Sequence, residues 1–342
     1  MSAMDQAGEV SESHATPDIG SVPVRGEYEA ERVTVDTDET RVVGKWGELI
    51  DAWREYLQCK EDNRLVLENV EEEAYKVMPH IHRWKPQYRR KTYGKFRDAE
   101  EWLERKFGGE VPSTFITLTT SHTDENGQLR PPTEVLEELN EGWDKIRKII
   151  SKRLSNVDYE YIRVLEPHKS GYPHMHIAIF GIASPVLGDE IQDRWVSEYA
   201  ENAGKSGQDV EIQNGRDAQL NAVAGYLMKY MSKSLARDDG GDSTAIEAMP
   251  STDGYEEFNS LLWLTDTRHF SMSQGITRAI SEDEDEDEDE ESEWVFVGTV
   301  KGVDVGYYTG DKAERLGAYL AGSRNQQMPP PLEDSRQERL PD

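Results

Sequence analysis

Two histidine pairs with the same spacing are the residues of this sequence best suited to metal chemistry. His174 and His176 lie in "GYPHMHIAIFG", and His80 and His82 lie in "MPHIHRW". Side chains alternate between the two faces of a β-strand, so each pair would present two imidazoles on one face, roughly 6 to 7 Å apart. Imidazoles at that separation can share a divalent cation. The sequence therefore offers two candidate metal sites.

The neighbouring residues make His174 and His176 the stronger candidate for a metal site. Their strand is apolar on its other face, and the preceding segment "YEYIRVLE" forms a second strand that would make a hairpin with it. With an even register, Glu166 lies directly across from His174 and supplies a third ligand. His168, in the connecting turn, is the alternative third ligand. Two histidines and a carboxylate suit Mg²⁺ or Mn²⁺, and imidazole favours Mn²⁺.

The first pair lies in a basic stretch, residues 80–97, that has seven arginines and lysines and no acidic residue. Trp84, Tyr88, Tyr93 and Phe96 are interleaved with these charges. Such a pattern fits phosphate pairing and base stacking on single-stranded DNA, although an exposed basic loop is the alternative. We interpret His80 and His82 as part of this segment. The predicted DNA-binding residues are Arg83, Lys85, Arg89, Arg90, Lys91, Lys95 and Arg97.

The composition limits the setting in which the protein works. The 342 residues contain 39 Lys and Arg against 68 Asp and Glu, a formal charge of -29, and ten of the acids are consecutive, from Glu282 to Glu291. A spread of acids over the rest of the chain suits the cytoplasm of a halophile, because salt screens their repulsion. An ordinary acidic protein with a disordered tail is the alternative. Cys59 is the single cysteine, which excludes a disulfide framework and a cysteine-rich zinc site.

Hydropathy points to a soluble protein of the cytoplasm. No apolar run approaches the roughly 18 residues of a membrane span, and the first residues show no basic-then-apolar signal pattern. We therefore expect no membrane partner.

Periodicity predicts an alternation of helices and strands. The order β-α-β-β-α-β-α in the middle of the chain fits an α+β domain of two layers with an antiparallel sheet. The expected helices are 44–58, 97–109, 131–154, 184–204 and 218–236, and the expected strands are 113–122, 159–166, 173–181 and 208–215.

The last of these helices, "AQLNAVAGYLMKYMSKSLA", places Tyr226 and Tyr230 one turn apart on one face. Lys229 and Lys233 follow each tyrosine by three residues, where they can hold a phosphate or stabilise a phenolate. Ordinary amphipathic packing also explains this pattern. Beside a metal-bound phosphate, however, either tyrosine can act as a nucleophile and form a phosphotyrosine intermediate.

Three segments in order, "FITLTT", "GYPHMHIAIFG" and "YLMKYMSK", resemble motifs 1, 2 and 3 of the HUH endonuclease superfamily. They are most similar to rolling-circle replication initiators (Rep) of the two-tyrosine type, found in phage gene A proteins and in haloarchaeal plasmids and viruses. The resemblance covers residues 113–235. It implies a ferredoxin-like or RRM-like core with helices on one face of the sheet. It also implies that His174 and His176 bind the metal, with Glu166 as third ligand.

The resemblance further implies an activity. Tyr230 would nick one strand of single-stranded or hairpin origin DNA and stay joined to the 5′ phosphate. The freed 3′-OH primes synthesis by a host polymerase, and Tyr226 carries the second cleavage that rejoins the circle. The chain has no Gly-x-x-x-x-Gly-Lys-Ser/Thr string, so unwinding would need a host helicase. Alternatives are a two-tyrosine transposase, a relaxase, or an origin-binding module with a degenerate site.

These expectations divide the chain into a catalytic domain and flanking segments. The HUH domain would span residues 111–237, after a disordered tail and a helical, basic, DNA-contacting extension. The flanking segments are the tail 1–42, the extension 43–110, a linker 238–254, a sheet-closing segment 255–280, an acidic linker 281–293, a small β/α piece 294–320 and a disordered tail 321–342.

Overall fold

The computed structural model describes residues 27–35, 40–109, 111–200, 208–213, 254–287 and 294–322. The predicted tyrosine helix, 218–236, lies outside these residues, as do Tyr226, Lys229, Tyr230 and Lys233. The same holds for almost all of the predicted linker 238–254 and for the C-terminal tail.

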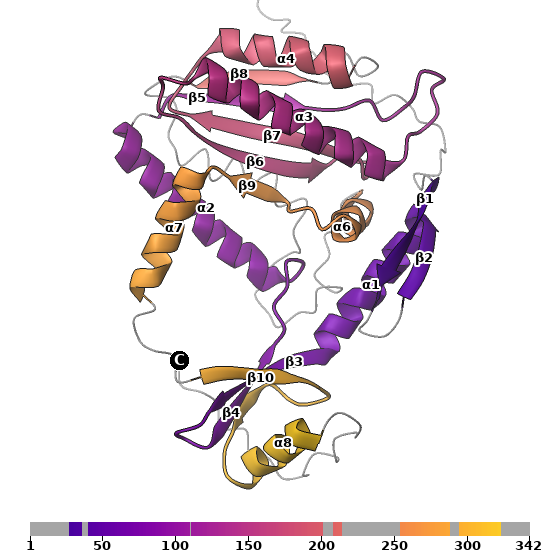
Figure 1. Cartoon of the computed structure of the whole chain (residues 1–342), viewed down its shortest axis with the longest axis vertical. Coiled ribbons are helices and arrows are strands. Elements are labelled where there is room, and N and C mark those ends of the chain that lie inside the picture. Colours follow the sequence, from indigo (N-terminus) through magenta and orange to yellow (C-terminus); the bar gives the residue numbers. More distant parts are fainter. Residues whose placement is uncertain are drawn as a thin grey trace, which may run out of the picture.

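A five-stranded antiparallel sheet forms the centre of the fold, in the order β8-β5-β7-β6-β9 (Figure 1). The middle strand, β7, carries both His174 and His176. The alternation of β-branched residues in "STFITL" and "PHMHIAIF" explains why these segments are strands. The strands are β5 (Ser113–Leu118), β6 (Glu160–Pro167), β7 (Pro173–Phe180), β8 (Asp209–Gln213) and β9 (Phe270–Met272).

Helices α3 (Pro132–Arg153) and α4 (Pro185–Tyr199) cover one face of this sheet. The side chains of Met175, Ile177 and Ile179 of β7 project from that face. They pack against Trp143 of α3 and Trp195 of α4. The α+β class and the hairpin of β6 and β7 are therefore confirmed.

The opposite face of the sheet is also partly covered, which the sequence interpretation did not include. Phe96 of α2 (Pro86–Phe107) and Ile276 of α7 (Gln274–Asp287) pack on Ala178 and Phe180, near the end of β7. The prediction of helices on one face of the core sheet is thus confirmed for α3 and α4, and α2 and α7, which come from outside the predicted core 111–237, add a partial layer on the other face. Because these two helices bury the Phe180 end, the histidines at the start of β7 occupy the other end of this face.

A second, four-stranded antiparallel sheet has the order β10-β3-β4-β11, and α8 (Asp311–Gly322) packs on it through Val66, Val77 and Leu316. The predicted piece 294–320 is therefore not a separate unit, because its strands pair with strands of the predicted extension 43–110. The strands are β3 (Asn63–Asn69), β4 (Ala74–Pro79), β10 (Trp294–Lys301) and β11 (Gly306–Tyr308).

Two boundary predictions are also corrected. The disorder expected for 1–42 does not extend over β1 (Glu27–Thr34) and β2 (Thr40–Lys45), which form a hairpin beside α1 (Trp46–Asp62). The acidic linker expected from 281 begins as helix, since α7 continues to Asp287.

The segment 255–280, predicted to close the sheet, lies against the main sheet. It supplies α6 (Tyr255–Leu264) and then the edge strand β9. An aromatic cluster of Trp53, Trp84 and Tyr255 joins α6 to α1 and to the loop before α2. In the part of the chain that the structure describes, no helix combines the length and the apolar character that crossing a membrane requires.

Candidate metal centre

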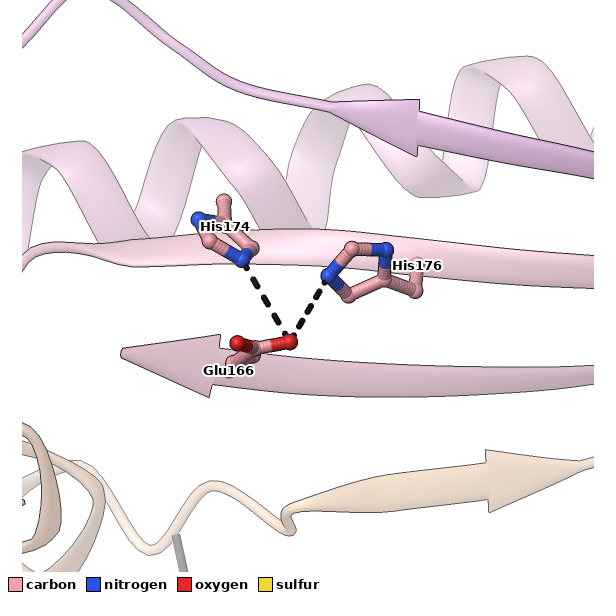
Figure 2. A group of neighbouring side chains, drawn as sticks. All are labelled: Glu166, His174 and His176. Carbon is pink, nitrogen blue, oxygen red and sulfur yellow. Dashed lines mark ion pairs between the residues drawn. The ribbon is translucent and has the colours of Figure 1, made fainter. Parts of the chain in front are cut away.

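The hairpin register brings the predicted ligands together. Glu166 of β6 lies directly opposite His174 of β7, as the even register predicted. His176 lies two residues further along β7, so its side chain is on the same face as His174. Figure 2 shows both imidazoles turned toward the carboxylate of Glu166. Among the described residues, these three form the group of His, Cys, Asp and Glu side chains that can hold a metal ion.

The distances fit a single cation. The Nε2 atoms of His174 and His176 lie 3.7 and 2.9 Å from the same oxygen of Glu166, Oε2. All three candidate ligand atoms lie within 4.8 Å of one another. Neighbouring ligands of an octahedral ion, each bonded at about 2.1 Å, are roughly 3 Å apart. Small side-chain adjustments are therefore enough to bind the ion.

Burial makes the group asymmetric. The side chains of Glu166, His176 and His174 are 1, 7 and 16 % exposed, respectively. A carboxylate this deeply buried is stabilised by a nearby cation, which fits a divalent metal ion beside Oε2. Because His174 is the most exposed of the three, a substrate would approach from its side.

Thr117 orients His176 from the neighbouring strand and was not identified from the sequence. It lies opposite His176 in the pairing of β5 with β7, and its hydroxyl is 3.0 Å from Nδ1 of the imidazole. When Nδ1–H donates to this hydroxyl, the lone pair of Nε2 is available to a metal ion. Its position in "FITLTT" was the available signal, but only the strand pairing shows which threonine faces the histidine.

His168, the alternative third ligand, is not part of the group. Its Nδ1 lies 3.3 Å from the hydroxyl of Ser170, and its ring centre is 6.4 Å from that of His174. Burial, followed by the proximity of His174, lowers the pKa of His168. The geometry thus selects Glu166 over His168.

A further histidine, His122, lies behind His168 and was also missed. Its ring stacks on Tyr172 at 4.6 Å and meets His168 edge-on at 5.7 Å. Burial is the main reason why the pKa of His122 is lowered to about 4, with His168 as the next cause. His122 is therefore neutral near pH 7. Its isolated position in "TTSHTDENG" gave no signal of this contact.

The basic segment 80–97 does not form one exposed surface. The guanidinium of Arg83 stacks on Trp84 at 4.4 Å and donates to the carbonyls of Thr267 and Leu262 at 2.7 and 2.9 Å. Lys85 is 7 % exposed. Lys85 is thus buried, and Arg83 is half-buried with its guanidinium bonded to backbone carbonyls, since the loop before α2 packs against α6. We therefore remove both from the predicted DNA-binding set.

The remaining basic residues lie on α2, a helix where a loop was the alternative. Phe96, Ala99 and Leu103 bury one side of α2 against the sheet. Arg90, Lys91 and Arg97 are exposed, and Arg89 and Lys95 are half-buried. Tyr93 is 47 % exposed beside them. A basic face with one exposed aromatic ring thus remains.

His80 and His82 do not form a second metal site. Their rings are 6.2 Å apart, but Lys60 and Lys85 are close enough to disfavour a bound cation. His82 is 9 % exposed, and burial, assisted by Lys85, lowers its pKa to about 3. The interpretation of this pair as exposed or DNA-facing is therefore wrong for His82, whose imidazole is a neutral part of the interior.

Comparison with known proteins identifies relatives in halophiles and viruses. The chain is 28 % identical over 290 residues to an "Uncharacterized 36 kDa protein" of Halobacterium salinarum, covering 81 % of this chain and 89 % of the relative. It is 30 % identical over 226 residues to "Uncharacterized protein 1" of Halorubrum pleomorphic virus 1, covering 61 % of this chain and 43 % of that protein.

A third relative has a replication name. The "Replication protein" of Haemophilus phage HP1 is 35 % identical over 152 residues, which is 41 % of this chain and 18 % of the phage protein. No solved structure matches the chain.

The family described as "Putative rep protein (DUF1424)" matches residues 23–314. This match includes both sheets, the hairpin with Glu166, His174 and His176, and the predicted tyrosine helix. Because it spans most of the sequence, the chain belongs to this family of rep proteins.

Proposed function

We propose that this protein is a rolling-circle replication initiator that nicks and rejoins one strand of single-stranded origin DNA. The observation that carries the proposal is the convergence of Glu166, His174 and His176 on one point of the main sheet, at the end of the face that α2 and α7 do not cover. Membership of the rep family and the similarity to a phage replication protein support a role in DNA replication. The haloarchaeal relative is consistent with a halophilic host.

In this proposal the three side chains hold Mg²⁺ or Mn²⁺. Glu166 contributes the negative charge, and the two imidazoles contribute neutral nitrogen ligands, a set that favours Mn²⁺. When bound, the ion polarises a non-bridging oxygen of the scissile phosphate. Thr117 holds His176 in the tautomer and orientation that this requires.

Tyr230 is the proposed nucleophile. Its phenol oxygen forms a bond to the phosphorus while the bond between phosphorus and the 3′ oxygen breaks. The electron pair of the broken bond stays on the 3′ oxygen, which takes up a proton, and the phenol gives up its own. Lys233 and Lys229 stabilise the phenolate and the phosphate. Tyr226 then makes a second cleavage of the same kind, and the 3′-OH that it frees attacks the phosphotyrosine of Tyr230. The bond between phosphorus and the Tyr230 oxygen breaks, the phenolate takes up a proton, and the strand is rejoined.

The exposed face of α2 is the proposed surface for the DNA backbone. Arg89, Arg90, Lys91, Lys95 and Arg97 would neutralise phosphates, and Tyr93 would stack on a base. This is the part of the basic segment that remains accessible after Arg83 and Lys85 are removed from the set.

The test is a nicking assay on labelled oligonucleotides that carry candidate origin sequences, with Mn²⁺ and in high salt. A denaturing gel should show a band that is retarded by the covalently attached protein. Glu166→Gln should remove this adduct, and Tyr230→Phe should remove the first cleavage. Lys169→Gln, an exposed change in the same hairpin turn, is the matched control and should leave the adduct unchanged.

The outcomes separate the parts of the proposal. Absence of an adduct with wild-type protein across the origin panel would overturn the enzymatic function. If Tyr230→Phe and Tyr226→Phe both behave like wild type, the assignment of the tyrosines is wrong. Cleavage at the ends of a mobile element instead of a replication origin would identify a transposase.

A further inference from the structure

One face of the four-stranded sheet is not covered by any helix among the described residues. α8 packs on the other face, through Val66, Val77 and Val300. Figure 1 shows α8 on one side of this sheet, with β10 and β4 above it. Residues paired across antiparallel strands project from the same face, so the strand registers identify the side chains of the face away from α8. We refer to it as the open face.

One row of the open face crosses all four strands. Phe296 of β10 pairs with Leu67 of β3, Leu67 with Lys76 of β4, and Lys76 with Tyr307 of β11. Phe296 is 57 % exposed and Tyr307 is 46 % exposed. The sheet therefore presents two aromatic rings to solvent at the ends of one row, with a lysine between them.

A third aromatic ring lies in the next row. Trp294 pairs with Asn69, which pairs with Ala74. Because the two central side chains of this row are small, the indole of Trp294 reaches Tyr307, and the ring centres are 5.6 Å apart in an edge-on arrangement. By their registers, the three rings lie on the same side of the sheet.

The strand residues of the open face include two lysines and no carboxylate, in contrast to the acidic chain as a whole. Glu68 is the single carboxylate in these four strands, which the structure describes throughout, and it lies on the face of α8, where it accepts a hydrogen bond from Tyr75. Lys76 and Lys301 lie on the open face by their register. In a chain of net charge -29, an aromatic surface with two lysines and no strand carboxylate fits a negatively charged partner.

The ends of the open face differ. The turn between β3 and β4 contains Glu71, Glu72 and Glu73, and Glu72 accepts a hydrogen bond from the hydroxyl of Tyr307. Lys301 pairs with Asn63 at the opposite end. A polyanion would therefore enter from the Lys301 end and reach as far as Tyr307, whose hydroxyl is held by the acidic turn.

We propose that the open face binds single-stranded DNA, with bases stacked on Phe296, Tyr307 and Trp294 and phosphates paired with Lys76 and Lys301. Aromatic residues on a four-stranded sheet can stack two or three bases, and every base offers a ring to such a surface. Stacking also persists in high salt, where phosphate pairing alone is screened. The choice of DNA as the nucleic acid rests on the proposed function. The surface is distinct from the metal centre, since it lies on the other sheet.

The test measures binding of a fluorescein-labelled oligothymidylate of about 15 nucleotides to the full chain by anisotropy. EDTA is present so that binding is observed without nicking. Phe296→Ala should raise the dissociation constant about 5- to 100-fold, and Phe296→Trp should keep binding near wild type. Val295→Ala is the matched control, because Val295 is 59 % exposed on the same strand and projects from the opposite face.

The contribution of Lys76 to DNA binding is measured separately, from the salt dependence of the affinity. Lys76→Gln should reduce the slope of log affinity against log salt concentration by about 0.7, the share of one phosphate on a single strand. An unchanged slope would remove Lys76 from the binding surface.

Equal dissociation constants for Phe296→Ala, Tyr307→Ala and Val295→Ala would overturn the proposal. If Phe296→Ala instead changes the oligomeric state of the DNA-free protein and leaves DNA affinity intact, the open face is a contact between copies of the chain and the proposal is wrong. The outcome of the nicking assay does not depend on the outcome of this binding assay. Loss of binding in Phe296→Ala without any adduct in wild type would retain the open-face proposal and reject the enzymatic one.

Discussion

Removal of one hydroxyl group next to His176 tests whether the proposed metal centre works as the geometry indicates. Thr117→Val keeps the shape of the side chain and the β-branched character of β5, but it deletes the hydrogen bond of 3.0 Å to Nδ1. In this variant the imidazole of His176 has lost its contact with the hydroxyl of residue 117, so the ring can rotate more freely. We expect weaker metal binding and an unchanged fold.

The expected size follows from the difference between the two states of the site. Leaving a buried polar atom without its partner costs about 1 to 3 kcal/mol. The hydrogen bond also exists before the metal binds, so only its strengthening on binding and the orientation of the ring affect the affinity. Loss of such an outer contact typically weakens metal binding by about 10- to 100-fold. We therefore expect about a 10- to 30-fold increase in the dissociation constant for Mn²⁺, equivalent to about 1.4 to 2 kcal/mol.

Isothermal titration calorimetry with MnCl₂ in buffered KCl measures this constant directly. Thr117→Ser restores a hydroxyl and should recover most of the affinity. Thr119→Val is the matched control, because the contacts of Thr119 with Gln208 and Trp195 use its backbone amide and carbonyl. Equal affinities of Thr117→Val and wild type would refute the orienting role of Thr117, and absence of Mn²⁺ and Mg²⁺ binding in wild type would refute the metal centre.

Two further predictions concern stability. The pKa of His82 is lowered from 6.5 to about 3, so the unfolded chain takes up a proton below pH 6.5 while the folded protein does not. Stability is therefore lost as the pH falls, and His82→Leu should reduce the loss between pH 7 and 5 by about 2 kcal/mol in chemical denaturation; an unaltered pH profile would contradict the buried neutral imidazole. In α3, an added Cβ at Gly142 would lie 2.6 Å from the ring of Trp195, whereas nothing lies within 4 Å of one at Gly94 in α2. Gly142→Ala should lower the free energy of unfolding by about 1 to 3 kcal/mol, and Gly94→Ala should raise it by about 1 kcal/mol, so shifts of the same sign would count against the packing of α3 on α4.

Local patterns in the sequence predicted the elements of the main sheet well. The alternating segments around Phe115 and Ile177 are strands, and the helix starting at Pro132 ends within one residue of its predicted end. These elements follow from residue periodicity, which depends on neighbours in the sequence. Segments in which charge and periodicity indicate different structures were harder to predict. The basic segment after Lys85 is helical because Phe96, Ala99 and Leu103 bury one side of it, although its charges suggested a loop.

Long-range pairing could not be predicted. Trp294 and Asn69 are far apart in the sequence, and no periodicity of either strand indicates that they are neighbours in one sheet. The same applies to α2 and α7, which meet only because both bury apolar side chains on Ala178 and Phe180. Such contacts depend on which surfaces remain uncovered after the local elements have formed.

The sequence by itself predicted the three side chains of the candidate metal centre. His174 and His176 share a face because strand side chains alternate, and Glu166 faces them because a short turn restricts the hairpin register. Tertiary structure decided which other residues join them. It placed Thr117 against His176 from a strand far away in the sequence and kept His168 out of the group. It also buried His82 beside Trp84 and stacked the half-buried Arg83 on the same ring. The physical reason is that alternation and turn length act between neighbours, whereas burial is decided by the packing of the whole chain.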